Sequence, residues 1–179
     1  VARRARPSSI ASVIAGAVER AMSGGIAEFT IDLALPDLAA TERLAVALAP
    51  LLRVGDVVCL HGDLGSGKTT FTRFLLRALG VADEVASPTF NLVLTYDTTA
   101  GPLWHFDLYR LEAPAEAYEL GIEDAFADAV SVIEWPDRLG SLLPEDRIDI
   151  TLTITGDAAR QAHIAGHGAV AGRLRALAP

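Results

Sequence analysis

Apolar and polar positions alternate along this chain in two rhythms, and their order predicts the architecture. Strands are predicted where apolar residues alternate or form short runs, at 29–33, 56–60, 90–96, 103–108, 130–133, 147–155 and 161–165. Helices are predicted where apolar residues recur at helical spacing, at 36–51, 69–79 and 115–120. Because strands and helices alternate through the middle of the chain, we expect an α/β fold with a mainly parallel central sheet flanked by helices.

One glycine-rich segment lies between a predicted strand and a predicted helix. Residues Gly62-Asp63-Leu64-Gly65-Ser66-Gly67-Lys68-Thr69 fit the pattern G-x-x-x-x-G-K-[ST] in full. The glycines let successive backbone N–H groups face one point, and the positive end of the following helix adds to it. Lys68, the only lysine in the sequence, can reach β- and γ-phosphates, and the Thr69 hydroxyl can bind Mg²⁺. The segment predicts a site for ATP and Mg²⁺.

Two acidic residues end later apolar runs, as a metal-assisted phosphate site requires. Asp107 follows the run at 103–106 and Glu134 follows the run at 130–133. Ligands of α/β proteins bind at the carboxyl ends of strands, so either acid can contact Mg²⁺. We therefore take Lys68, Asp107 and Glu134 as the candidate catalytic residues.

Two further features bear on how such a site would be regulated. Ser87-Pro88-Thr89-Phe90 lies between the two parts of the site and is a candidate switch segment. No arginine is an obvious finger, and Arg110 is the nearest candidate by sequence. Without a finger, we expect slow intrinsic hydrolysis that a partner stimulates.

Charge and composition limit the classes of partner and location. The formal net charge is −8, although residues 1–20 contain four arginines and a single acid. An acidic body repels bare nucleic acid, so any RNA should be held mainly by a partner protein. Cys59 is the only cysteine, which excludes internal disulfides and fits a cytoplasmic protein. Uninterrupted apolar stretches fall short of the roughly 18 residues that span a membrane, so none is expected to do so.

The chain is expected to contain one domain. Residues 28–166 contain all the predicted elements and should form a single domain of the P-loop NTPase class. We expect this domain to be an ATPase. The Arg- and Ser-rich residues 1–27 are expected to be a disordered extension, and 167–179 a C-terminal tail.

Four motifs occur in an order that resembles a known family. They are His61–Phe71, Ser87-Pro88-Thr89-Phe90, His105-Phe106-Asp107-Leu108-Tyr109-Arg110-Leu111 and Ile133-Glu134-Trp135-Pro136. The chain resembles the TsaE (YjeE) family, bacterial ATPases of tRNA threonylcarbamoyladenosine biosynthesis, over about residues 30–165. The resemblance implies a role in forming N6-threonylcarbamoyladenosine (t6A) at position 37 of tRNAs that read codons starting with A. It also implies action through a TsaB–TsaD complex, with tRNA contacted only indirectly.

The same resemblance assigns roles to residues of this chain. The implied Mg²⁺ ligands are Thr69 and Glu134, with Asp107 as the Walker B acid. The implied switch segment is 87–90, and Leu38 and Arg160 are implied to border the base. The implied nucleotide-binding residues are Asp63, Leu64, Gly65, Ser66, Gly67, Lys68, Thr69, Thr70, Leu38 and Arg160.

Two other functions are compatible with a phosphate loop. A small-molecule kinase would need an acceptor pocket and usually an arginine-rich lid, yet only Arg110 and Arg138 lie between Gly80 and Pro144. A binding module with a structural nucleotide would not need both Asp107 and Glu134. A partner-regulated ATPase of tRNA modification is therefore the leading hypothesis.

Overall fold

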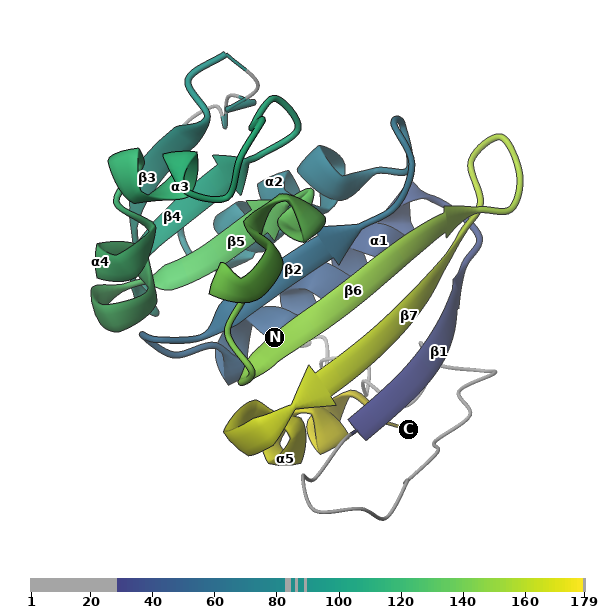
Figure 1. Ribbon diagram of the computed structural model, residues 1–179. Helices are drawn as coiled ribbons and strands as arrows, with labels where there is room; N and C mark the ends of the chain where they lie inside the picture. Colours follow the sequence, from purple (N-terminus) through teal and green to yellow (C-terminus); the bar gives the residue numbers. More distant parts are fainter. Residues whose placement is uncertain (1–28, 83–84, 86, 89, 179) are drawn as a thin grey trace.

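The computed structural model describes residues 29–82, 85, 87–88 and 90–178, and it is built on one seven-stranded sheet (Figure 1). The strand order is β1-β7-β6-β2-β5-β4-β3. The strands are β1 (Phe29–Leu35), β2 (Val57–His61), β3 (Val93–Thr98), β4 (Gly101–Asp107), β5 (Val130–Glu134), β6 (Arg147–Ile154) and β7 (Arg160–His167). Neighbouring strands from β6 through β2 and β5 to β4 are parallel, which confirms the predicted parallel core.

Both edges of the sheet are antiparallel, so the sheet as a whole is mixed. Strand β3 pairs with β4 across a tight turn, and β6 pairs with β7 in the predicted hairpin. Strand β1 joins the free side of β7, also antiparallel. Short turns between consecutive strands permit only antiparallel pairing, whereas parallel neighbours need a longer crossover.

Helices cover the sheet on two sides (Figure 1). They are α1 (Leu38–Leu48), η2 (Ala49–Leu51), α2 (Lys68–Ala78), α3 (Glu116–Glu119), α4 (Ile122–Asp128), η3 (Pro136–Leu142), η4 (Gly168–Val170), α5 (Ala171–Leu174) and η5 (Arg175–Leu177). Helices α1 and α2 lie together behind the sheet, while α3, α4 and η3 lie in front of its other half. The two sides correspond to two clusters of buried apolar side chains.

The alternation of side chains in β2 shows how one strand serves both clusters. Val58 and Leu60 face the cluster under α1 and α2, and Val57 and Cys59 face the cluster under α3 and α4. All four are buried, which fits a central parallel strand covered on both faces. The end of β2 is thereby held in place by packing on both sides, and the phosphate loop begins there.

Helix α1 begins at Leu38 because Asp37 caps it. The Asp37 backbone is extended, and its carboxylate accepts a hydrogen bond of 2.7 Å from the Ala40 amide. Leu44 and Leu48 then bury the same face of the helix against the sheet. Leu38 is left 58% exposed at the start of the helix, close to the phosphate loop.

Several local expectations differ from the structure. The strand predicted at 90–96 begins at Val93, because Leu92 has φ 64 and leaves the extended region. Helices α4 and η3 follow no predicted pattern, since each is too short to show a clear period. Residues 1–27, expected to be disordered, lie outside the described part of the chain.

The segment expected to be a C-terminal tail is packed onto the sheet. Residues 168–177 form η4, α5 and η5, and Val170, Ala171, Leu174 and Leu177 are buried in the cluster under α1. The helices are single turns, so their apolar residues show too little periodicity to be recognised in the sequence. Within the described residues, no helix is long and apolar enough to cross a membrane.

Candidate nucleotide site

The phosphate loop joins β2 to α2, and its backbone requires glycine. Gly62, Gly65 and Gly67 have φ values of 130°, 80° and 107°, which other residues rarely adopt. At Gly62 a Cβ atom would also collide with the Leu152 carbonyl oxygen. The backbone therefore requires glycine at all three of these positions of the motif.

Lys68 is buried inside this loop, with an exposed fraction of 4%. Its ammonium donates hydrogen bonds to the carbonyl oxygens of Gly62 (2.6 Å) and Asp63 (2.9 Å). The Trp135 ring lies against the same nitrogen, 4.1 Å from Nζ to the ring centroid. Burial lowers the pKa of Lys68, and the charges of Glu134, Asp107 and Asp63 partly oppose that shift.

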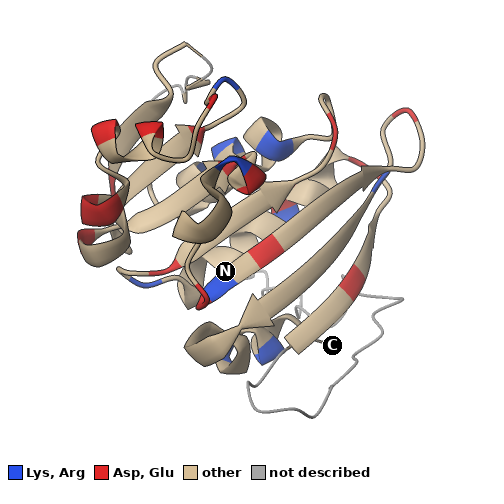
Figure 2. Ribbon diagram, in the orientation of Figure 1, with Lys and Arg blue, Asp and Glu red and all other residues tan. Residues whose placement is uncertain are grey.

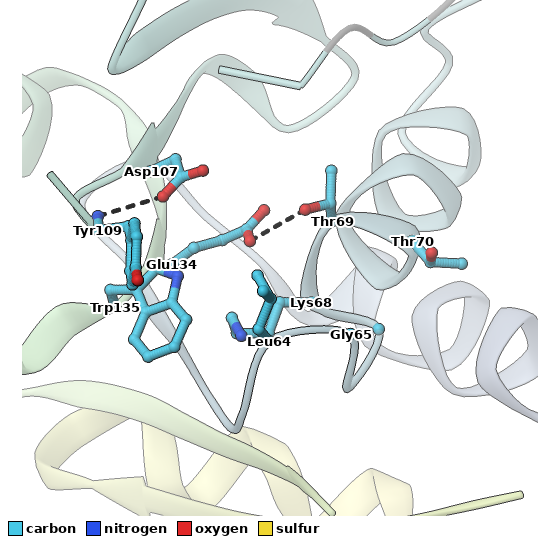
Figure 3. A pocket seen from close by; sticks show the side chains of 10 residues that line it. Leu64, Gly65, Lys68, Thr69, Thr70, Asp107, Tyr109, Glu134 and Trp135 are labelled. Carbon is cyan, nitrogen blue, oxygen red and sulfur yellow. Dashed lines mark hydrogen bonds between the residues drawn. The ribbon is translucent and has the colours of Figure 1, made fainter. Parts of the chain in front are cut away.

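The two predicted acids lie side by side at the carboxyl ends of two neighbouring strands (Figure 3). Asp107 ends β4 and Glu134 ends β5, and they are register partners in the parallel pair. The Thr69 hydroxyl donates a hydrogen bond of 3.0 Å to Glu134 Oε2. The backbone N–H of Tyr109 donates to Asp107 Oδ1 at 3.2 Å. Both carboxylates are buried, so the structure brings together the loop, the hydroxyl and both acids.

A functional side chain that sequence reasoning missed supports Glu134 from the other side. His105 Nε2 lies 2.9 Å from Glu134 Oε1, and the histidine is fully buried. An ionised carboxylate only accepts, so Nε2 carries the hydrogen. The signal available in the sequence is the position of His105 two residues before Asp107, which places both side chains on one face of β4.

The cleft beside Lys68 has a volume of about 230 Å³ and an aromatic wall. Its lining residues are Leu64, Gly65, Gly67, Lys68, Thr69, Thr70, Asp107, Tyr109, Glu134 and Trp135. Trp135 has φ 60 and ψ 50, a conformation that costs energy for a residue with a side chain. Its ring centroid lies 5.0 Å from that of Tyr109. This packing holds the indole over the lysine despite the backbone strain.

A second cleft of about 260 Å³ also borders the loop. Leu38 and Arg160 both line it, together with Gly65, Ser66, Gly67 and Thr70. Arg160 donates hydrogen bonds to the carbonyl oxygens of Ser66 (3.0 Å) and Gly65 (3.3 Å). Arg160 therefore ties the β6–β7 hairpin to the loop, and the two clefts share Gly65, Gly67 and Thr70 in their linings.

The candidate switch segment lies only partly within the described residues, because Thr89 is outside them. Ser87 and Pro88 precede Phe90, which is 81% exposed. The guanidinium of Arg110 lies 5.0 Å from the Phe90 ring centroid. Arg110 and these segment residues do not line the cleft beside Lys68.

The side chains at this site can hold Mg²⁺ if water and phosphate oxygens supply its remaining ligands. Within the described ranges, no three His, Cys, Asp or Glu side chains form a group that could hold a metal ion. Thr69, Asp107 and Glu134 offer a hydroxyl and two carboxylates, the oxygen donors that Mg²⁺ takes. Mg²⁺ usually completes its octahedron with water and substrate phosphate oxygens, so the residues present fit such an ion.

Comparison with known proteins shows which family the chain resembles. Residues 35–162 match the profile of the family described as "Threonylcarbamoyl adenosine biosynthesis protein TsaE". The chain belongs to the TsaE family. The match runs from the end of β1 into β7 and includes both clefts and both acids.

Individual TsaE relatives cover most of the domain. A protein of Rickettsia bellii named tRNA threonylcarbamoyladenosine biosynthesis protein TsaE is 41% identical over 125 residues, 69% of this chain and 87% of the relative. The protein of the same name from Bacillus subtilis is 38% identical over 122 residues, 68% of this chain and 76% of the relative. The crystal structure of Bacillus subtilis YdiB matches with a TM-score of 0.68 and 29% identity, over 87% of this chain and 94% of that one. The P-loop fold predicted from the sequence is confirmed.

Proposed function

We propose that this chain is a Mg²⁺-dependent ATPase that supports t6A formation at position 37 of tRNAs reading A-starting codons, through a TsaB–TsaD complex. Family membership supports the pathway. The phosphate loop with its buried lysine supports ATP as the ligand. We expect the activity in the cytoplasm, where tRNA is used.

The observation that carries the proposal is the hydrogen-bonded series Thr69–Glu134–His105 beside Lys68. In that series the Thr69 hydroxyl and the Glu134 carboxylate are already in contact, and both line the cleft beside Lys68, so together they would hold Mg²⁺. A bound Mg²⁺ would neutralise charge on the β- and γ-phosphate oxygens. The Thr69 hydroxyl donates its hydrogen to Glu134, so the lone pairs of its oxygen can bind a cation.

Each residue then has a distinct task. Lys68 exchanges its two loop carbonyl partners for phosphate oxygens, which compensate its burial more strongly. The loop amides and the positive end of α2 bind the remaining phosphate charge. Glu134 orients the attacking water, and its fixed position limits the reorganisation needed.

The site also explains why a partner would be needed. Among the described residues that line the cleft beside Lys68, none is an arginine. An arginine that neutralises transition-state charge is worth about 10³–10⁵ in rate in related phosphoryl transfers. We therefore propose slow intrinsic hydrolysis that the TsaB–TsaD complex stimulates, with tRNA held by that complex rather than by this acidic chain.

Phosphate release tests the proposal. With Mg²⁺ and ATP, wild-type turnover should be slow and should rise when TsaB–TsaD and tRNA are added. Glu134→Gln should lower the stimulated rate about 100-fold or more, because the neutral amide can still contact the water but cannot accept its proton or hold Mg²⁺ as a carboxylate does. The control Glu145→Gln removes the same charge at an exposed position and should keep the rate.

Two results would count against the proposal. Rapid turnover that ignores the partner complex would remove the regulatory role. Transfer of phosphate to a small-molecule acceptor would favour the kinase instead.

A further inference from the structure

A shallow apolar groove lies in front of the sheet, away from both clefts of the nucleotide site. It has a volume of about 430 Å³ and is lined by Leu92, Leu111, Ala115, Glu116, Glu119 and Leu120. Three leucines and an alanine form its floor and walls, and the two glutamates of α3 stand exposed at its rim. We call it the acidic groove. An apolar surface that remains open beside charged side chains is typical of protein docking sites.

Most of the charged residues near the acidic groove in the sequence are acids. From Glu112 to Asp128 the sequence has no Lys or Arg, and it has six acids: Glu112, Glu116, Glu119, Glu123, Asp124 and Asp128. Figure 2 shows acidic residues on both α3 and α4. Within the described residues, none of the six forms an ion pair. Glu116 accepts a hydrogen bond from the Ala113 amide. Uncompensated acids around an apolar groove select a basic partner.

One wall of the acidic groove is joined to the nucleotide site through the backbone. Leu92 has φ 64, which is strained for a branched side chain. Its carbonyl accepts a hydrogen bond of 2.9 Å from the Asp107 amide. Its amide donates to the Pro88 carbonyl at 2.6 Å, within the candidate switch segment. A ligand that moves Leu92 must therefore move a neighbour of the nucleotide.

Leu111, another lining residue, has a similar connection. The Leu111 amide donates to the Leu108 carbonyl at 3.0 Å, and the Leu108 amide donates to the Glu134 carbonyl at 3.1 Å. Leu92 is thus one backbone hydrogen bond from Asp107, and Leu111 is two backbone hydrogen bonds from Glu134. Backbone contacts of this kind transmit small displacements because the packed sheet around them is rigid.

We propose that the acidic groove binds a partner-protein segment in which Lys or Arg flanks a large apolar side chain, and that binding there adjusts Asp107 and the switch segment through Leu92. The apolar side chain enters between the leucines, and the basic side chains pair with Glu112 and Glu119. This inference rests on the proposed function, in which hydrolysis responds to a partner, and it names the surface that receives that partner.

Binding of the purified TsaB–TsaD complex to the full chain tests the surface. The double variant Glu112→Gln/Glu119→Gln should weaken binding about fivefold and reduce stimulated hydrolysis, while basal hydrolysis stays unchanged. The matched control Glu42→Gln/Glu145→Gln removes the same charge at exposed positions elsewhere and should bind like wild type. Neither pair contributes to the nucleotide site.

A photocrosslinking side chain at the exposed Ala115 tests the chemistry of the occupant. The captured TsaB or TsaD peptide should contain a Lys or Arg beside a large apolar residue. An acidic or wholly polar peptide would overturn the proposal, as would capture of neither protein.

The other outcomes separate this inference from the proposed function. Wild-type binding that the double variant leaves unchanged would overturn the docking surface and leave the proposed function standing. Failure of the wild-type chain to bind the complex would overturn both. Tighter binding by the double variant would mean that the chain's own Arg-rich residues 1–20 occupy the acidic groove, which also overturns the proposal.

Discussion

At the scale of single residues, the candidate site depends on how Glu134 is held. Its two carboxylate oxygens have different partners, the Thr69 hydroxyl and the ring of His105. Within the described residues, the other ring nitrogen of His105 is buried without a hydrogen-bond partner. An unsatisfied buried nitrogen is costly, so this histidine is tolerated for the contact that its other nitrogen makes.

Replacing His105 should therefore separate positioning from packing. His105→Leu keeps a bulky side chain but removes the donor, and kcat for ATP hydrolysis should fall about 10- to 100-fold with little change in KM. His105→Gln can still donate through its amide and should recover most of the rate. Steady-state kinetics of both variants measures this difference, and equal losses in the two would assign His105 a purely structural role.

At the scale of elements, one carboxylate ties three neighbouring strands together at the front of the sheet. Asp149 of β6 lies 2.9 Å from His61 at the end of β2 and 2.9 Å from His167 at the end of β7, and it pairs with Arg147. Burial would raise the pKa of Asp149, but the hydrogen bond from His61 and the charges of Arg147, His61 and His167 hold it below its ordinary value. The strand end from which the phosphate loop departs is fixed by this group.

The Asp149 cluster should make folding stability depend on acid. Because the folded-state pKa is lowered, its contribution is complete above the ordinary value of 3.8 and is lost as pH falls through the folded-state pKa. Asp149→Asn should lower the free energy of unfolding by about 2 kcal/mol at pH 7 and by less in acid. Urea unfolding measures both values.

An exposed pair provides the control for Asp149. Asp32 lies 2.9 Å from His163, but both side chains are roughly half exposed, so Asp32→Asn should change stability little. A loss for Asp149→Asn that is equally large in acid would contradict the electrostatic explanation.

At the scale of the whole molecule, the sequence predicts contiguous features better than assembled ones. The phosphate loop could be predicted because all its residues lie in one segment, and Asp107 and Glu134 because each ends an apolar run. The hydrogen bond between His105 and Glu134 forms because β4 lies beside β5. Neither motif indicates that order of strands. The packing of 168–177 could not be predicted, because single helical turns carry no measurable period.

The C-terminal helices should contribute to global stability. Leu174 is fully buried, so Leu174→Ala should lower the free energy of unfolding by about 3 kcal/mol. Val46 on α1 is 54% exposed, and Val46→Ala should have little effect. Thermal and urea unfolding compare the two. Similar small losses would mean that the segment 168–177 behaves as the tail expected from the sequence.

The most direct test of the account is a crystal structure of the chain with Mg²⁺ and a non-hydrolysable ATP analogue. We predict that the nucleotide spans both clefts, with its base near Leu38 and its triphosphate inside the loop. Lys68 should have left the carbonyls of Gly62 and Asp63 for phosphate oxygens, and Mg²⁺ should be bound by the Thr69 hydroxyl. A nucleotide bound elsewhere, or a Lys68 that still contacts both carbonyls beside it, would contradict the account.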